Sequence, residues 1–366
     1  MPRIRSEIAA LKPYKVGRQL ADVARENGLD PSNIIKLTAN ESPEGPFPGV
    51  IEATTQVLAR SNRYPDNSCW DLGHALAEDL DVDFSNLMFG AGSVALLSEI
   101  GLAVGESGTK MVYGWPSFIM YRFAAIWAGS GFVEVPLDDS FQLDLDAMAA
   151  AIDDDTTVVV LCNPNNPTGT IRSADDIEAF IDAVPESVLV IVDEAYHDFV
   201  TDPTYRTEIP LAVERPNVVV LRTFSKIYAL AAHRVGYAIG RADLITELRK
   251  VQAPLTVNQV AQAAAIASLG QTAELRRRQR ENSARRHHLV GALTERGIRM
   301  TESHTNFVYF ELGENADEVV AAMTAQGVII RGMGPGWVRM TIGNDEENRR
   351  FLGALDAALE GVSPQA

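Results

Sequence analysis

The chain is 366 residues long, with 46% hydrophobic and 22% charged residues, an ordinary globular composition that gives no sign of disorder. It has 49 acidic and 32 basic residues, and the formal charge of −17 disfavours a surface whose main task is to bind nucleic acid or anionic lipid. Since the length exceeds that of one typical domain, we expect two domains around one site, or one large core with a smaller domain attached.

The cysteines and the apolar segments indicate a cytoplasmic protein. Cys69 and Cys162 lie far apart and lack the spacing of a disulfide scaffold or a zinc site. Residues 1–20 lack an apolar signal core, and no segment reaches roughly 18 uninterrupted apolar residues. We therefore expect a protein of the reducing cytoplasm that has no metal site, is not exported and does not span a membrane.

The first 46 residues are predicted to form an N-terminal arm and part of a small domain. They contain a helix-like stretch around Val23 and a short apolar run over 34–37. A crossing rich in proline and glycine follows over 42–48, and this composition is typical of a linker or of the edge of a site.

Residues 47–245 alternate between apolar, β-prone runs and helical patterns. Short Val/Ile/Leu strands separated by helices indicate a mainly parallel sheet covered on both faces, which predicts the large domain of an α/β fold. The predicted strands lie at 87–89, 110–113, 158–162, 188–192, 218–221 and 235–239.

Residues 246–366 are predicted to form a smaller α+β domain. Long helical patterns come first, and shorter strands at 306–310, 328–331 and 338–341 precede a final helix. A basic run lies in the helical stretch, and we interpret it as a solvated helix face rather than a binding patch because the chain as a whole is acidic. The run consists of Arg276, Arg277, Arg278, Arg280, Arg285 and Arg286.

Three of the predicted strands end in polar segments. Strand 158–162 leads into NPNNPTG at 163–169, strand 188–192 leads into DEAY at 193–196, and strand 218–221 leads into TFSK at 223–226. Taken singly, the NPNNPTG segment could be a turn, Asp193 of DEAY could cap a helix, and Lys226 of TFSK could be a surface lysine. In an open parallel sheet, however, ligands bind at the carboxyl ends of the strands, so we expect the three segments to meet in one crevice.

Together with Arg234, eight residues after Lys226, these segments resemble the fold-type I pyridoxal-phosphate aminotransferases, most closely the histidinol-phosphate aminotransferase branch. The resemblance extends from LKPY at 11–14 to VRMTIG at 338–343. It implies a large α/β domain with a seven-stranded, mainly parallel sheet and a smaller α+β domain. It also implies pyridoxal phosphate as cofactor and a homodimer with shared sites.

The resemblance assigns the reacting groups. Lys226 would carry the cofactor as a Schiff base and later, as a neutral amine, move the proton from the substrate Cα to the cofactor. Asp193 would pair with the ring nitrogen and keep it protonated, so that the ring can act as an electron sink. Asn166 and Tyr196 would hydrogen-bond the phenolic oxygen of the ring.

The cofactor phosphate is expected at the segment 90–94, which follows a strand and opens an apolar helix, where free N–H groups and the helix dipole attract an anion. Phe118 would stack on the ring, and Tyr64 would reach the phosphate from the neighbouring subunit. By resemblance, the phosphate cup consists of Gly92, Ser93, Val94, Thr223, Ser225 and Arg234.

A dinucleotide-binding interpretation of the same glycines is the first alternative. The pattern Gly90-x-Gly92-x-x-Ala95 satisfies a loose nicotinamide fingerprint, which would make the protein an NAD-dependent dehydrogenase. Such a site needs an acidic residue at the end of the next strand, but strand 110–113 ends in Gly114 and Trp115. This alternative also leaves DEAY and FSK unexplained.

The substrate is predicted from fewer residues. Arg339 matches the family arginine that grips a substrate carboxylate, and Asn40 and Asn306 occupy substrate-side positions of the branch. Histidinol-phosphate enzymes commonly have an acidic pair where Val94 and Ala95 stand, so the chain looks more like the aromatic aminotransferases. We expect ping-pong transamination between a phenylalanine-like amino acid and 2-oxoglutarate, with histidinol phosphate as the alternative substrate. A pyridoxal-phosphate lyase or decarboxylase stays open as a further alternative.

Overall fold

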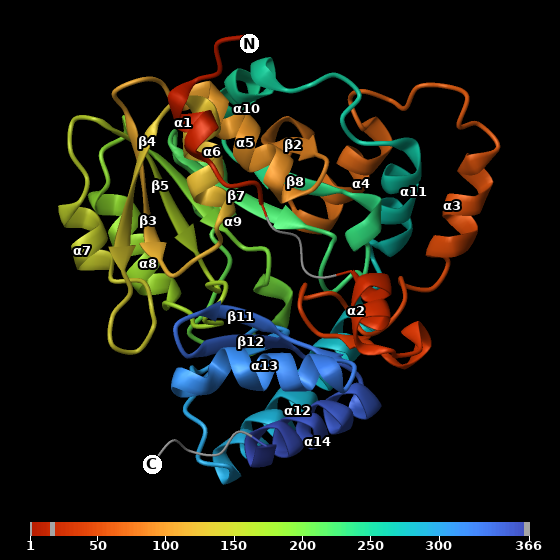
Figure 1. Cartoon of the computed structure of the whole chain (residues 1–366). Helices are drawn as coiled ribbons and strands as arrows, with labels where there is room; N and C mark the ends of the chain where they lie inside the picture. Colours follow the sequence, from red (N-terminus) through yellow and green to blue (C-terminus); the bar gives the residue numbers. More distant parts are fainter. Residues whose placement is uncertain (1, 15–18, 362–366) are drawn as a thin grey trace.

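The computed structural model describes residues 2–14 and 19–361, which form a large part and a smaller part (Figure 1). The large part holds a seven-stranded sheet between helices, and the smaller part holds the C-terminal strands and helices. The predicted α/β fold with a seven-stranded sheet is therefore confirmed. Residues 1, 15–18 and 362–366 of the predicted arm and C-terminal domain lie outside the described residues.

Six of the seven strands of the large sheet run in the same direction. The order across the sheet is β2-β8-β7-β6-β5-β3-β4, and β8 is antiparallel to both of its neighbours. The strands are β2 (Leu87–Gly90), β3 (Lys110–Trp115), β4 (Gly131–Pro136), β5 (Thr156–Cys162), β6 (Leu189–Asp193), β7 (Val218–Thr223) and β8 (Gly236–Ile239). The sequence predicted all of them except β4. This strand lies at the sheet edge with Phe132 exposed, so no continuous apolar run marks it.

Alternate residues of the central strands are buried on opposite faces of the sheet. Val158 and Val160 pack in the core shared with one set of helices, whereas Val159 and Leu161 pack in the core shared with the other. Burial on both faces explains why these strands are continuous Val/Ile/Leu runs. The first set is α5 (Ser93–Val104), α6 (Met120–Ala128) and α10 (Ala242–Leu248), and the second is α4 (Trp70–Leu80), α7 (Leu145–Ala150), α8 (Ala174–Ala183), α9 (Ile209–Glu214) and α11 (Gln259–Ser268).

The smaller part is built on a three-stranded antiparallel sheet with the order β11-β12-β9. Its elements are α12 (Thr272–Glu295), β9 (Phe307–Glu311), α13 (Ala316–Ala325), β10 (Val328–Ile329), β11 (Arg331–Gly334), β12 (Trp337–Thr341) and α14 (Asp345–Gly361). The predicted strand 328–331 is in fact two strands, because β10 leaves this sheet and pairs with β1 (Ile35–Lys36). The N-terminal run 34–37 is thereby joined to the C-terminal part.

Helix α12 corrects the interpretation of the basic run. Arg278 and Arg286 are buried, and each donates to backbone carbonyls of neighbouring loops. The Nη1 atom of Arg278 lies 3.1 Å from the carbonyl oxygen of Ile227, next to Lys226, and the Nη1 atom of Arg286 lies 3.0 Å from that of Thr305. The solvated-face interpretation is therefore wrong for these two residues, because their guanidinium groups are buried and donate to backbone carbonyls of loops instead of facing solvent.

The remaining α-helices of the described residues are α1 (Ser6–Ala10), α2 (Leu20–Asn27) and α3 (Val50–Leu58). Helix α1 packs on α6, and α11 packs on α3 and α4 in the core of the large part. The predicted division at residues 46 and 245 stays a prediction, although α11, beyond 245, contributes to the large core. No helix among the described residues is long and apolar enough to cross a membrane.

Candidate active site

The polar strand ends meet at two adjoining cavities on the carboxyl edge of the large sheet. A cavity of about 230 Å³ is lined by most residues predicted to hold the cofactor, and a cavity of about 710 Å³ is lined by Asn40 and Arg339. Phe118, Asn166 and Lys226 line both cavities, as does Tyr196. The smaller cavity also contains Ser93, Val94, Asp193, Thr223, Ser225 and Arg234.

Lys226 lies in the turn after β7, between the two cavities. Its Nζ atom is 3.3 Å from the carbonyl oxygen of Ala39 and 5.5 Å from the centroid of the Tyr196 ring. Burial, and secondarily the nearby charge of Arg339, lowers the pKa of Lys226 to about 8. At pH 7 about a tenth of such an amine is neutral, against roughly one part in a few thousand for an ordinary lysine. The site therefore favours an amine that can act as a nucleophile and as a base.

Asp193 ends β6 with its carboxylate buried, at 5% exposure. The carboxylate accepts from the Tyr121 hydroxyl at 2.8 Å and from the Ala195 amide at 3.1 Å. Among the residues that the structure describes, no cationic side chain lies within ion-pair distance of it. Burial raises the pKa of Asp193, and a cation brought next to the carboxylate would stabilise its charged form. A protonated pyridine nitrogen is such a cation.

A cup for an anion lies at the N-terminus of α5. Gly92 caps this helix with φ +83°, and a Cβ atom at this position would collide with the guanidinium of Arg234. Arg234 donates to the Ser225 hydroxyl at 3.4 Å, and the Thr223 hydroxyl donates to Ser225 at 2.9 Å. Arg234 has no carboxylate within ion-pair distance in the described part of the chain. A guanidinium, two hydroxyl groups and a helix N-terminus around one cavity suit a phosphate.

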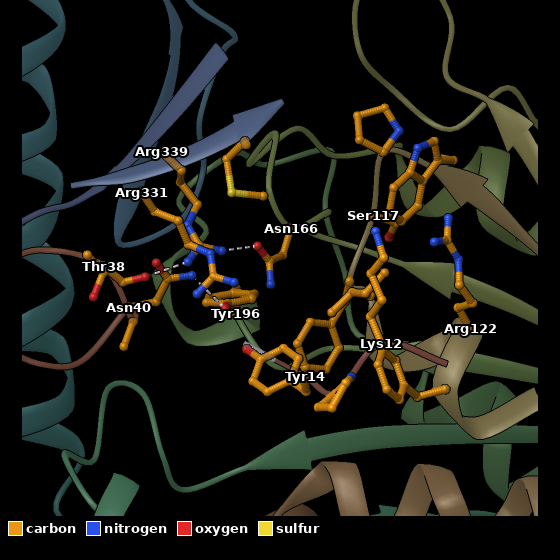
Figure 2. A pocket seen from close by; sticks show the side chains of 18 of the residues that line it. Lys12, Tyr14, Thr38, Asn40, Ser117, Arg122, Asn166, Tyr196, Arg331 and Arg339 are labelled. Carbon is orange, nitrogen blue, oxygen red and sulfur yellow. Dashed lines mark hydrogen bonds between the residues drawn. The ribbon is translucent and has the colours of Figure 1, made fainter. Parts of the chain in front are cut away.

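Arg339 extends from β12 into the larger cavity (Figure 2). It donates to the side-chain oxygen of Asn166 and, at 2.7 Å, to the carbonyl oxygen of Thr38. Arg339 is only 7% exposed, and its Nε atom has no hydrogen-bond partner among the described residues. Within residues 2–14 and 19–361, no carboxylate pairs with it. A buried guanidinium without a counter-ion can bind a substrate carboxylate.

Three predicted site residues are placed differently from the rest. Tyr64 is 86% exposed and contacts neither cavity. Asn306 lines a separate small cavity, and it reaches the site only through its side-chain amide, which donates to the carbonyl oxygen of Asn40 at 3.1 Å. Gly92 forms the rim of the phosphate cup but does not line the smaller cavity.

Sequence reasoning missed several residues of the site. Tyr121 hydrogen-bonds Asp193 from helix α6, where an apolar helical pattern gives no indication that a hydroxyl faces the strand ends. The larger cavity is also lined by residues of the N-terminal arm, of β11, and of the stretch from the end of β3 into α6 that were not predicted to belong to the site. These additional lining residues include Lys12, Tyr14, Lys36, Thr38, Trp115, Ile119, Arg122, Phe123, Arg331 and Met333.

Comparison with known proteins identifies the class. Residues 32–355 match the family model of aminotransferases of class I and II, so the chain belongs to this family of pyridoxal-phosphate-dependent enzymes. The chain is 43% identical over 353 residues to an aromatic amino acid aminotransferase of Rhodococcus erythropolis (strain PR4), an alignment that covers 96% of this chain and 95% of the relative. It is 40% identical over 360 residues to histidinol-phosphate aminotransferase 1 of Cupriavidus pinatubonensis, with 96% of both chains covered.

A solved structure gives the same assignment. The histidinol-phosphate aminotransferase of Sinorhizobium meliloti, in complex with pyridoxal 5'-phosphate, superposes with a TM-score of 0.91 at 28% identity and covers 99% of both chains. The predicted family, fold type and cofactor are thereby confirmed. The dinucleotide interpretation fails on topology as well, because the strand after Gly90–Ala95, β3, is not a neighbour of β2 in the sheet.

Proposed function

We propose that this aminotransferase moves an amino group between an aromatic, phenylalanine-like amino acid and 2-oxoglutarate by a ping-pong mechanism. The observation that carries the proposal is the wall of the larger cavity beside Lys226, where aromatic and aliphatic side chains gather. A phenyl ring placed there gains binding energy from the apolar area that it buries. The wall includes Tyr14, Trp115, Phe118, Ile119 and Phe123.

The guanidinium of Arg122, which lies beside this wall, is already ion-paired. Arg122 lines the same side of the cavity, opposite Arg339 and Arg331 (Figure 2). Its guanidinium binds both carboxylate oxygens of Glu134, at 2.6 and 2.8 Å, and lies 5.0 Å from the centroid of the Trp115 ring. An aromatic side chain beside Trp115 would therefore meet a guanidinium whose charge is neutralised, which supports an apolar substrate group.

The opposite end of the cavity is suited to carboxylates. Arg339 has no counter-ion among the described residues, and Arg331 and Lys36 line the cavity as well. Both phenylalanine and glutamate carry an α-carboxylate that Arg339 could hold by paired hydrogen bonds. This shared grip lets one site accept the amino donor and the amino acceptor in turn.

The cofactor residues take the following roles in the proposal. Pyridoxal phosphate supplies an electron sink that allows a proton to leave the substrate Cα. Lys226 would hold the cofactor and, as a neutral amine, would take up that proton and return it. Asp193 would keep the ring nitrogen charged, Asn166 and Tyr196 would donate to the ring oxygen, and Phe118 would stack on the ring. The residues that would bind the phosphate are Gly92, Ser93, Val94, Thr223, Ser225 and Arg234.

Histidinol phosphate is the second candidate substrate. Lys12, Lys36, Arg331 and Arg339 all line the larger cavity, and their charges could match a phosphate group as well as a carboxylate. The Cupriavidus relative named histidinol-phosphate aminotransferase 1 is almost as similar as the aromatic one. A direct comparison of substrates is therefore the decisive experiment.

We expect phenylalanine or tyrosine to be the best amino donor when phenylalanine, tyrosine, histidinol phosphate and alanine are assayed side by side with 2-oxoglutarate. Burial of an aromatic ring contributes on the order of 2 kcal/mol, so kcat/KM for phenylalanine should exceed that for alanine by at least about tenfold. Histidinol phosphate as the clear winner would overturn the aromatic assignment. Turnover of the amino acid without any keto acid would indicate a lyase or decarboxylase instead.

We also propose that the active unit is a homodimer in the cytoplasm. Besides Tyr64, the large apolar side chains of Ile51, Leu58 and Trp70 on α3 and α4 are exposed. Large exposed apolar side chains in one stretch of the chain are a feature of surfaces that form interfaces. A second copy that covers these side chains would bring Tyr64 to the phosphate cup of its partner.

Mixed dimers test this sharing. Heterodimers of a Tyr64→Ala chain with a Lys226→Ala chain should regain about half of the native activity, because one of the two sites then receives both intact residues. The matched control pairs a native chain with a Tyr64→Ala/Lys226→Ala chain, which carries the same substitutions in the other arrangement. If Tyr64 served the site of its own chain, the control would be the active species and the mixed dimer would not.

A further inference from the structure

Asn40 is held in an unusual conformation at the point where three segments of the chain meet. It has φ +54°, a left-handed value for a non-glycine residue, and it is 1% exposed. Its amide N–H donates to the Thr341 hydroxyl at 2.9 Å, its carbonyl oxygen accepts from Asn306 at 3.1 Å, and its side-chain Nδ2 donates to the Tyr196 hydroxyl at 2.8 Å. So many contacts fix one side-chain orientation.

The orientation of the Asn40 amide follows from the hydrogen bonds of Thr341. The Thr341 hydroxyl donates to Oδ1 of Asn40 at 3.2 Å, and it is buried. With the Asn40 amide reversed, this hydroxyl proton would have no acceptor among the residues that the structure describes, which is costly in a buried position. The Nδ2 group of Asn40 therefore faces Tyr196 as a donor.

The Tyr196 hydroxyl consequently has a proton to give away. It accepts from Asn40, and in the described part of the chain it has no acceptor for its own hydrogen. Burial raises the pKa of Tyr196 to about 12, so the hydroxyl stays protonated at neutral pH. Donation from Asn40 opposes that rise and makes the phenol a stronger donor, since hydrogen bonds in a chain polarise one another.

We propose that Asn40 is a positioning residue that acts through Tyr196, by directing and strengthening the hydrogen bond from Tyr196 to the phenolic oxygen of the cofactor ring. The inference rests on the proposed role of Tyr196 and replaces the predicted substrate contact of Asn40. A donor to that oxygen stabilises negative charge on it and so lowers the pKa of the protonated nitrogen that joins Lys226 to the cofactor.

The test measures the pH midpoint of the visible absorbance change of the holoenzyme, without substrate. Asn40→Gly, which suits a positive φ, should raise the midpoint by about half a unit to one unit, as expected for one hydrogen bond. Tyr196→Phe should raise it at least as much. In the Tyr196→Phe background, Asn40→Gly should add nothing, because the residue through which it acts is gone.

The outcomes separate the two proposals. If Tyr196→Phe shifts the midpoint and Asn40→Gly does not, the inference fails while the role of Tyr196 stands. Equal shifts by Asn40→Gly in both backgrounds also overturn the inference, because Asn40 would then act by another route. If neither variant shifts the midpoint, both proposals fail. Should Asn40→Gly not fold, Thr341→Val takes its place in the cycle, with the same expected sign, because it frees the Asn40 amide to reverse.

Discussion

Replacement of Lys226 by alanine is expected to abolish transamination, with a fall in turnover of at least about ten-thousandfold, since both the covalent attachment and the proton transfer are lost. The fold should survive, because within the described residues the Lys226 side chain donates a single hydrogen bond, to the carbonyl oxygen of Ala39. The measurement is turnover of phenylalanine with 2-oxoglutarate, together with borohydride reduction and peptide mapping of the native holoenzyme. The reduced adduct should map to residue 226.

Lys250 provides the control for this experiment. It lies outside both cavities and forms an exposed ion pair with Glu247 at 2.6 Å, so Lys250→Ala should leave turnover within about twofold of native. The proposed role of Lys226 would be refuted by an adduct on another lysine. It would equally be refuted by a Lys226→Ala enzyme that retains more than about a tenth of native turnover.

Much of the large sheet could be predicted because its physical cause is local. Strands buried on both faces must be apolar throughout, and this signal located every strand except β4. The rule that ligands bind at the carboxyl ends of parallel strands then predicts that Asn166, Asp193 and Lys226 lie close together. These residues indeed line one cavity.

The rest of the site depends on contacts between distant segments, which local patterns do not encode. Tyr121 on helix α6 donates to Asp193 at the end of strand β6. Asn40 donates to Thr341, which follows it by about three hundred residues. The burial of Arg278 could not be predicted because two of its acceptors are backbone carbonyls of distant loops, and these leave no pattern in the sequence. The proposed role of Tyr64 in a neighbouring subunit concerns a second chain, so neither local patterns nor the contacts of one chain can place it.

The Asp193→Asn variant should lose roughly two to four orders of magnitude in turnover while its cofactor-free form becomes more stable. The loss follows from removal of the buried charge that would hold the ring nitrogen protonated, since breaking a buried ion pair costs about 3–5 kcal/mol. The cofactor-free form should gain stability because it lacks the cation that would stabilise the buried carboxylate. Burial raises the pKa of Asp193 in the folded chain, so the folded state binds more protons than the unfolded state, and stability falls as pH rises above the ordinary carboxyl pKa. A neutral amide removes that penalty.

Turnover and thermal unfolding of the cofactor-free protein at neutral pH measure the two effects. Asp198 provides a matched control, because burial raises its pKa to about 6 although it lines neither cavity. Asp198→Asn should therefore leave turnover near the native value. An Asp193→Asn enzyme within tenfold of native turnover would show that the carboxylate does not hold the ring nitrogen. If the cofactor-free Asp193→Asn protein were less stable than the cofactor-free native protein, Asp193 would be a structural group. A buried carboxylate that lacks its cation should become more stable, not less, when it is replaced by a neutral amide.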